Sequence, residues 1–204
     1  PRSTLDRSSA ASDVYKRQNL IRIIGGTLRG RKLEVPSGPK VRPSADRVRE
    51  ALFNMLDHRL HWQDFNVLDL YAGSGALGIE ALSRGARFAT FIESSKAHEK
   101  ILKKNLLTCK LTRECYDIFL DRAERWILSY SDPGNPSLIF LDPPYQENHY
   151  PQILKQLADS DSIQKGSVIA IESPKKMEFE FQNSLVLMVR KTYGGTALDL
   201  LEKQ

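Results

Sequence analysis

Short apolar runs alternate with amphipathic segments along the chain from residue 66 onward. The apolar runs are typical of buried β-strands and are expected at 66–71, 87–93, 115–119, 137–142 and 167–172. The intervening segments place apolar residues at helical spacing over 76–84, 95–107, 121–129 and 148–159. Strands and helices that alternate in this way indicate a parallel sheet whose connections are right-handed crossovers.

The two ends of the pattern differ from this alternation. Residues 20–24 and 31–35 are short β-type runs around a loop with glycines, and they predict an N-terminal β-hairpin. Apolar residues then recur at helical spacing over about 44–60. Near the other end, 185–191 and 197–201 predict an antiparallel hairpin.

Length and composition limit the classes that this pattern fits. The chain has 204 residues, of which 41% are hydrophobic and 27% charged, as in an ordinary globular α/β domain. It has no apolar stretch of about 18 residues, so no membrane span and no membrane partner are expected. The two cysteines, Cys109 and Cys115, are too few for a disulfide framework or a zinc site, and they fit a reducing cytoplasm. The four histidines show no ligand spacing, so no metal site is predicted.

We expect the chain to divide into three segments. Residues 1–18 lack an initiating Met and an apolar signal-peptide core, and we expect a disordered tail or a non-native segment there. Residues 19–43 are expected to hold the hairpin and a linker with several prolines. Residues 44–204 form the main domain, and a monomer is expected.

Basic residues are concentrated ahead of the main domain. The formal net charge is +5, and between Arg22 and Arg49 there are eight Lys or Arg residues against two acidic ones. Such a segment fits a surface that grips phosphate groups. An ordinary solvated face explains the same charges.

A glycine-rich loop is the first candidate for chemistry. Gly73, Gly75 and Gly78 follow a predicted strand and open a predicted helix, with Glu93 placed 20 residues after Gly73. Glycines in this context permit a close approach to a nucleotide-type cofactor, and a carboxylate at the end of the next strand can accept the ribose hydroxyl protons. Asp69 lies just before the loop, where it would repel a pyrophosphate and suit a cationic cofactor.

These charges favour S-adenosylmethionine, which carries a sulfonium, an ammonium and a ribose but no phosphate. A dinucleotide, or a turn that binds no ligand, are the alternatives. Asp121 follows the third predicted strand and can accept from the adenine amine, or it can act as a helix N-cap.

A second candidate ends the fourth predicted strand, at Asp142-Pro143-Pro144-Tyr145. The Asp142 carboxylate and the Pro143 carbonyl can each accept one N–H of a planar nucleobase amine. This pins the nitrogen and favours a pyramidal geometry with its lone pair aimed at a methyl donor. The prolines fix the direction of the carbonyl, and Tyr145 can stack on the base.

Together, these segments resemble a known bacterial family. Residues 24–33 (Ile-Gly-Gly-Thr-Leu-Arg-Gly-Arg-Lys-Leu), residues 42–54 (Arg-Pro-Ser-Ala-Asp-Arg-Val-Arg-Glu-Ala-Leu-Phe-Asn), the glycine loop and the Asp-Pro-Pro-Tyr segment are similar to those of RsmD-type methyltransferases. The similarity covers essentially residues 20–202. Residues 42–54 are the part of the similarity that is specific to this family. Many amino-methyltransferases share the glycine loop and the Asp-Pro-Pro-Tyr segment.

The resemblance implies a Rossmann-like class I S-adenosylmethionine-dependent methyltransferase with a seven-stranded, mostly parallel sheet, a C-terminal antiparallel hairpin and an N-terminal β-hairpin. It implies cofactor contacts at Asp69, Tyr71, Gly73, Ser74, Gly75, Gly78, Glu93, Asp121 and Arg122. It implies catalytic roles for Asp142, Pro143, Pro144 and Tyr145. RNA contacts are implied at Arg29, Arg31, Arg42 and Arg47.

The implied reaction is methylation of the exocyclic N2 amine of a guanine in 16S ribosomal RNA, free or in an assembling small subunit. An adenine-N6 DNA methyltransferase shares the acceptor chemistry but normally needs a target-recognition domain, for which this chain has no room. An NAD-dependent oxidoreductase and a ribosome-binding protein without catalysis are further alternatives. An ion pair between Arg47 and Glu50 is the structural alternative to RNA binding by Arg47.

Overall fold

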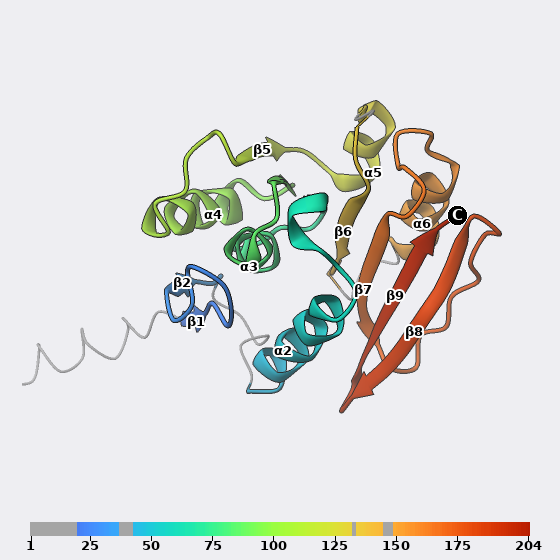
Figure 1. The fold of residues 1–204 in the computed structure, drawn as a ribbon, viewed down its shortest axis with the longest axis horizontal. Helices are drawn as coiled ribbons and strands as arrows, with labels where there is room; N and C mark the ends of the chain where they lie inside the picture. The colour runs from blue at the N-terminus through green and yellow to red at the C-terminus, as the bar shows by residue number, and fades with distance from the viewer. Residues whose placement is uncertain (1–19, 37–42, 132–133, 145–148) are drawn as a thin grey trace, which may run out of the picture.

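A single mixed sheet organises the protein, which was analysed as a computed structural model describing residues 20–36, 43–131, 134–144 and 149–204. The strand order is β5-β4-β3-β6-β7-β9-β8, and Figure 1 shows the sheet with its helices. Strands β3 to β7 pair in parallel, while β9 pairs antiparallel with both β7 and β8. The bounds are β3 Asn66–Asp69, β4 Phe88–Glu93, β5 Tyr116–Leu120, β6 Ser137–Leu141, β7 Val168–Pro174, β8 Leu185–Tyr193 and β9 Thr196–Lys203.

Helices cover both faces of this sheet, because its central strands carry apolar side chains on both sides. Val67 of β3 and Phe140 of β6 pack with α2, α3, α4 and the N-terminal hairpin. Leu68 and Ile139, one residue away, pack on the opposite face with α5 and α6. The helices are α2 Pro43–Asp57, α3 Ala76–Arg84, α4 Lys96–Thr108, α5 Ala123–Trp126 and α6 Tyr150–Asp159, with 3-10 turns at Trp62–Asp64 and Ile127–Ser129.

The predicted α/β class, the parallel core of the sheet and the C-terminal hairpin are confirmed. One predicted helix is shorter than expected. The helix expected over 121–129 is a four-residue α-helix from Ala123 to Trp126 that tightens into the 3-10 turn Ile127–Ser129. In the described part of the chain no helix is long and apolar enough to cross a membrane.

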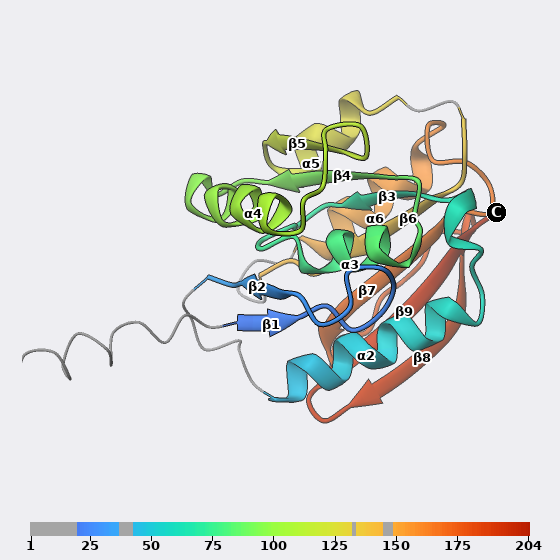
Figure 2. The ribbon, with the colours of Figure 1, turned by 60° about the vertical axis from the view of Figure 1, so that its left-hand side comes forward.

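The N-terminal hairpin, β1 Leu20–Arg22 and β2 Lys32–Glu34, docks on helix α3, as Figure 2 shows. The buried Glu80 carboxylate accepts from the backbone N–H groups of Ile24 and Gly25, both at 2.7 Å. Ser83 Oγ donates to the Gly25 carbonyl at 2.6 Å and accepts from Leu28 N–H at 2.9 Å. The hairpin is therefore attached to α3 by hydrogen bonds that give partners to several of its backbone groups.

Gly26 lies in close contact with the backbone of α3. Its φ is +72°, and an added Cβ would lie 1.8 Å from the Ser83 carbonyl oxygen. Gly30, in the same hairpin, has φ +84° but no heavy atom within 4 Å of an added Cβ. Substituting alanine at each position therefore separates two costs in stability. Gly30 reports the cost of the left-handed conformation alone, and Gly26 adds the cost of the contact with Ser83.

We expect Gly30→Ala to lower the free energy of unfolding by about 1–2 kcal/mol, the cost of the left-handed conformation for a residue with a Cβ. Gly26→Ala should cost a further ~1–3 kcal/mol, because the new methyl group displaces backbone rather than a flexible side chain. Urea denaturation of the two variants beside the parent chain measures both values. Equal losses for the two variants would show that the hairpin does not dock as described.

Candidate functional site

The carboxyl ends of β3, β4 and β6 place three acidic residues at one edge of the sheet. Asp69 ends β3 and is in register with Phe91 of β4 and Phe140 of β6. Glu93 and Asp142 each lie two residues beyond those partners. Glu93 ends β4 and Asp142 follows the last residue of β6, and these two strands flank β3. The loop from β3 to α3 therefore begins between two carboxylates, at the edge where open α/β sheets bind ligands.

Two of these carboxylates hold the backbone of the loop and of the first turn of α3. Glu93 Oε2 accepts from Gly73 N–H and Glu93 Oε1 from Ser95 N–H, both at 2.7 Å. Asp69 Oδ2 accepts from Gly78 N–H at 3.1 Å. A carboxylate has about four lone-pair sites, so each group retains capacity for a ligand while it fixes the loop.

Burial changes the ionisation of Asp69. The side chain is 2% exposed, and burial raises its pKa to about 7, with a smaller increase from the nearby negative charge of Glu93. The hydrogen bond from Gly78 acts in the opposite direction. A cation placed beside Asp69 would favour its ionised form.

A third side chain, Asn105 of α4, holds the loop from the other side. Its Nδ2 donates to the Ser74 carbonyl at 2.8 Å and to the Glu34 carbonyl at 2.8 Å. Its Oδ1 accepts from Glu34 N–H at 2.8 Å. Asn105 thus joins the loop to β2 of the N-terminal hairpin.

Gly78 allows α3 to lie against the sheet. A Cβ at this position would lie 2.3 Å from Cε1 of the Phe91 ring in β4. Gly73, Ser74 and Gly75 form the loop ahead of it, and Ser74 and Gly75 are buried. The glycine spacing read from the sequence therefore coincides with a close helix–strand contact.

The structure describes Asp142, Pro143 and Pro144 of the candidate acceptor segment directly after β6. Asp142 is half-buried, Pro143 is buried and Pro144 is exposed. Tyr145 lies outside the described residues. Leu70 N–H donates to the Phe140 carbonyl at 3.3 Å, so the backbone of β6 leads into the segment alongside the start of the glycine loop.

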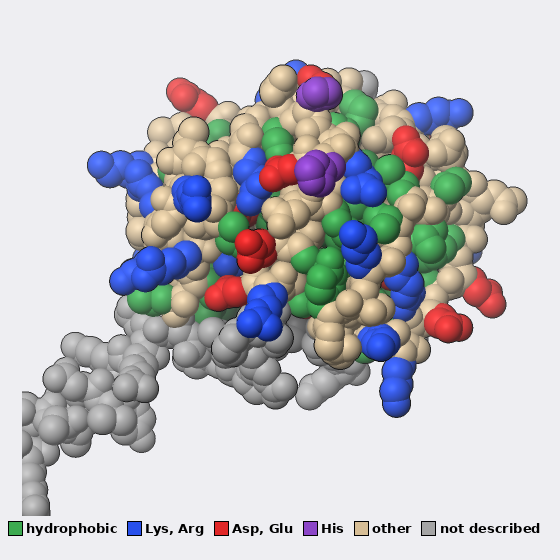
Figure 3. Space-filling view, turned by 60° about the horizontal axis from the view of Figure 1, so that its bottom comes forward, with side chains coloured by type: hydrophobic (Ala, Val, Ile, Leu, Met, Phe, Trp, Pro, Cys, Tyr) green, Lys and Arg blue, Asp and Glu red, His purple; other side chains and the backbone are tan. Residues whose placement is uncertain are grey.

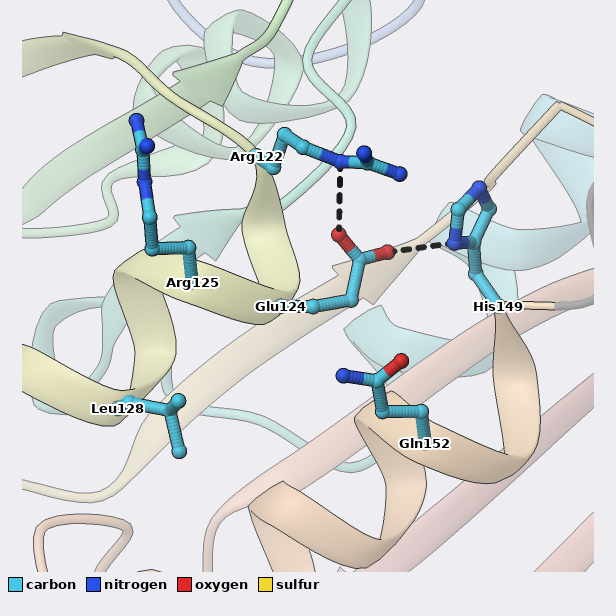
Figure 4. A pocket seen from close by; sticks show the side chains of 6 residues that line it. All are labelled: Arg122, Glu124, Arg125, Leu128, His149 and Gln152. Carbon is cyan, nitrogen blue, oxygen red and sulfur yellow. Dashed lines mark ion pairs between the residues drawn. The ribbon is translucent and has the colours of Figure 1, made fainter.

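A polar cluster lines a pocket of about 430 Å³ beside this edge, between α5 and the start of α6. Figure 4 shows the largely buried Glu124 between Arg122 and His149. Glu124 Oε1 lies 2.8 Å from His149 Nδ1 and accepts from the Tyr71 hydroxyl at 2.7 Å. Burial and this hydrogen bond raise the pKa of Tyr71. The cluster joins Tyr71, which follows β3, to the residue that precedes α6.

Asp121 does not cap the helix that follows β5. Arg122, not Asp121, occupies the N-cap position of α5, and its side chain makes no capping bond. Asp121 pairs instead with Arg125, one helical turn later, at 2.5 Å, and this partner lowers the pKa of Asp121. Contact of Asp121 or Arg122 with adenine stays a prediction.

The candidate RNA contacts are spread over the hairpin and α2. Arg29 and Arg47 are exposed, whereas Arg31 donates to the Thr108 carbonyl at the end of α4 at 2.9 Å. Arg42 lies outside the described residues. Figure 3 shows Lys and Arg side chains spread over this side of the molecule, interrupted by a few acidic ones.

Arg49, which the sequence did not single out, is the most buried of the α2 arginines whose side chains are described. It donates to the Arg22 carbonyl of β1 at 2.7 Å and pairs with Asp46 at 3.1 Å. Burial lowers its pKa, while Asp46, Glu80 and Glu172 act in the opposite direction. Arg49 therefore joins α2 to the hairpin.

Sequence reasoning did not single out Glu80, Asn105, Glu124 or His149. A signal exists for Asn105, because it lies three residues after the buried Leu102 and beside Leu106, on the apolar side of α4. Glu80 likewise interrupts the buried face of α3. Nothing in the spacing of Glu124 and His149 indicates that they meet.

Comparisons with known proteins give a consistent result. A family described as "Conserved hypothetical protein 95" matches residues 21–202. "Ribosomal RNA small subunit methyltransferase D" of Haemophilus influenzae is 36% identical over 174 residues, which cover 85% of this chain and 89% of that protein. The protein of the same name from Escherichia coli K12 is 42% identical over 153 residues, 75% of this chain and 74% of the relative. A solved structure described as "Putative methyltransferase yhhF from Escherichia coli" superposes with a TM-score of 0.79 at 36% identity, covering 91% of this chain and 98% of that one.

The ionisation of Asp69 gives a direct test of the site geometry. Its carboxyl carbon should titrate with a midpoint of about 7 in nuclear magnetic resonance of the folded protein, against an ordinary value of 3.8. Because the folded chain holds this proton more tightly than the unfolded chain, the Asp69 contribution to the free energy of unfolding should fall between about pH 4 and about pH 7. Asp69→Asn should remove that part of the pH dependence. A midpoint near about 4 would mean that Asp69 is solvated rather than enclosed.

Proposed function

Because this chain belongs to the family of ribosomal RNA small subunit methyltransferase D, we propose that it methylates small-subunit ribosomal RNA. The methyl donor is S-adenosylmethionine, and the acceptor is the exocyclic N2 amine of a guanine. The observation that carries the proposal is the arrangement at the sheet edge, where Glu93 ends β4 and the Asp142-Pro143 segment follows β6, the two strands that flank β3. A cofactor held by the loop after β3 and a base held by the end of β6 would therefore meet.

The donor set of the loop fits S-adenosylmethionine better than a dinucleotide. Gly73 N–H and Gly78 N–H are two of the groups that would bind a pyrophosphate. They already donate hydrogen bonds to Glu93 and Asp69, respectively. Both partners are carboxylates, which repel phosphate and attract a sulfonium or an ammonium group. The free lone pairs of Glu93 can accept the ribose hydroxyl protons, and Asp69 supplies the negative charge near the cationic end.

Asp142 and Pro143 would act mainly by holding the target amine in a fixed orientation. Asp142 and the Pro143 carbonyl each accept one N–H of the target amine, which holds its lone pair toward the methyl group. The ring of Pro143 fixes its φ, and Pro144 restricts the ψ that sets the direction of the Pro143 carbonyl, so these acceptors are preorganised. When bound, S-adenosylmethionine supplies an activated methyl group with a neutral leaving group. The methylated nitrogen then becomes acidic, and Asp142 or water takes its proton, so a strong general base is not needed.

The RNA would approach over the hairpin and α2. Arg29 and Arg47 are exposed there, and they would contact phosphates. Arg31 serves the interface with α4 as well, since it donates to the Thr108 carbonyl. Tyr145 would stack on the target base, and Arg42 would join the phosphate contacts. Binding should weaken as salt rises, as it does for contacts with nucleic-acid backbones.

The proposal is tested by transfer of radiolabelled methyl to RNA from cells that lack this activity, followed by identification of the labelled nucleoside. The parent chain should yield N2-methylguanosine. Asp142→Ala should reduce transfer by about a hundredfold or more, the usual cost of losing one preorganised contact in the transition state. Asp142→Asn keeps one carbonyl acceptor at the same position and should lose less activity than Asp142→Ala.

Each alternative outcome has a defined meaning. Transfer of label to DNA as N6-methyladenine, measured in a parallel assay with DNA as the substrate, would replace the proposal with a DNA methyltransferase. Near-normal turnover of Asp142→Ala would remove Asp142 from the reaction. Unchanged binding of S-adenosylmethionine by the same variant shows that any loss arises at the acceptor.

A further inference from the structure

We propose that Asn105 couples RNA binding to cofactor binding, an inference that rests on the proposed function. The N-terminal hairpin would hold RNA, and the loop between β3 and α3 would hold the cofactor. Asn105 is a positioning residue that contacts both. A ligand that orders one of them would therefore make the other easier to order.

The contacts of Asn105 have the form of a rigid bridge. The side chain is 1% exposed, and it makes its three hydrogen bonds, to Glu34 N–H, the Glu34 carbonyl and the Ser74 carbonyl, all at 2.8 Å. Both Nδ2 hydrogens are used, one toward the hairpin and one toward the loop. A buried amide that lost either partner would leave an unsatisfied polar group, which costs free energy. The loop and the hairpin are therefore held in matching positions.

Ser74 lies in the part of the loop that Glu93 also holds. Ser74 lies between Gly73, whose N–H is held by Glu93, and Gly75, which precedes α3. The loop backbone is thus fixed by Glu93 at one residue and by Asn105 at the next. If a cofactor engages Glu93, the position of the Ser74 carbonyl becomes more sharply defined, and through Asn105 so does the position of Glu34 in β2.

Other contacts hold the hairpin without reaching the loop. Ser83 binds Gly25 and Leu28 from the C-terminal half of α3. Lys104 pairs with the Glu34 carboxylate, and Arg31 donates to the Thr108 carbonyl. Each of these attaches the hairpin to a helix, but among the described contacts Asn105 is the side chain that bonds to both β2 and the glycine loop. Ser83 therefore serves as the matched control.

Such a bridge predicts a reciprocal effect between the two ligands. If RNA increases the affinity for the cofactor by some factor, the cofactor must increase the affinity for RNA by the same factor. Couplings of this type commonly lie in the range of about 5- to 150-fold. We expect the parent chain to show at least about a fivefold effect.

The experiment measures the dissociation constant of S-adenosylhomocysteine, which cannot donate a methyl group, with and without a saturating unmodified small-subunit rRNA transcript. The parent chain should bind it at least about fivefold more tightly with RNA present. Asn105→Ala should bring that ratio close to one. Ser83→Ala should weaken RNA binding through its loss of hairpin contacts but leave the ratio unchanged. A general loss of stability would raise the ratio rather than abolish it, because RNA bound to the folded chain also restores the folded population that binds S-adenosylhomocysteine.

A second measurement uses the parent chain alone, so it does not depend on whether Asn105→Ala folds. Hydrogen exchange should slow at Glu34 N–H, the donor to Asn105 Oδ1, when S-adenosylhomocysteine is added without RNA. Protection of Gly73 without any change at Glu34 would overturn the inference. So would a folded Asn105→Ala variant that kept the parental ratio.

Failure of the proposed function gives a different result. A parent chain that binds neither S-adenosylhomocysteine nor the transcript refutes the methyltransferase assignment itself. Binding of both with a ratio of one in the parent chain refutes the coupling and leaves the assignment in place.

Discussion

The loop between β3 and α3 is held by side chains that reach it from the surrounding elements, and the rest of the site depends on this constraint. Asp69 holds the Gly78 end, Glu93 holds Gly73, and Asn105 holds the Ser74 carbonyl. The three residues lie on β3, β4 and α4, so the conformation of the loop is set by the packing of the sheet and its helix. A loop fixed in this way can present the same surface to a ligand each time it binds.

The charges of these supporting side chains also bear on which ligand the loop would accept. Two carboxylates near loop amides favour a cation, and the burial of Asp69 makes its charge sensitive to what lies beside it. The same loop is joined through Asn105 to the hairpin that would hold RNA. The proposed cofactor site and the proposed RNA surface are thus parts of one hydrogen-bonded unit, separated in sequence but adjacent in the fold.

Much of the fold followed from the sequence because its strongest signals are local. The central strands are buried on both faces, so they appear as continuous apolar runs, and the observed β3 to β7 lie close to the predicted ranges. The glycine spacing indicated the start of α3 because it is also a local signal. The segment after β5 was harder, because Asp121 pairs with Arg125 instead of capping the helix, and the helix tightens after one turn. The spacing of apolar residues does not distinguish a continuous α-helix from one turn of α-helix followed by a 3-10 turn.

The buried polar contacts could not be predicted, because their partners lie far apart in the chain. Asn105 binds Glu34 across 71 residues, and Glu80 binds Ile24 across 56. Glu124 and His149 meet because α5 and α6 cover the same face of the sheet. A polar residue on an apolar helix face shows that a partner is needed, but only the topology identifies that partner.

Two carboxylates and a glycine loop would form a site for a cationic cofactor without phosphate. Titration calorimetry of S-adenosylmethionine and of NADH against the same preparation measures this preference. We expect S-adenosylmethionine to bind and NADH neither to bind nor to compete with it. Binding of NADH, with no heat from S-adenosylmethionine, would show that the loop accepts a pyrophosphate instead.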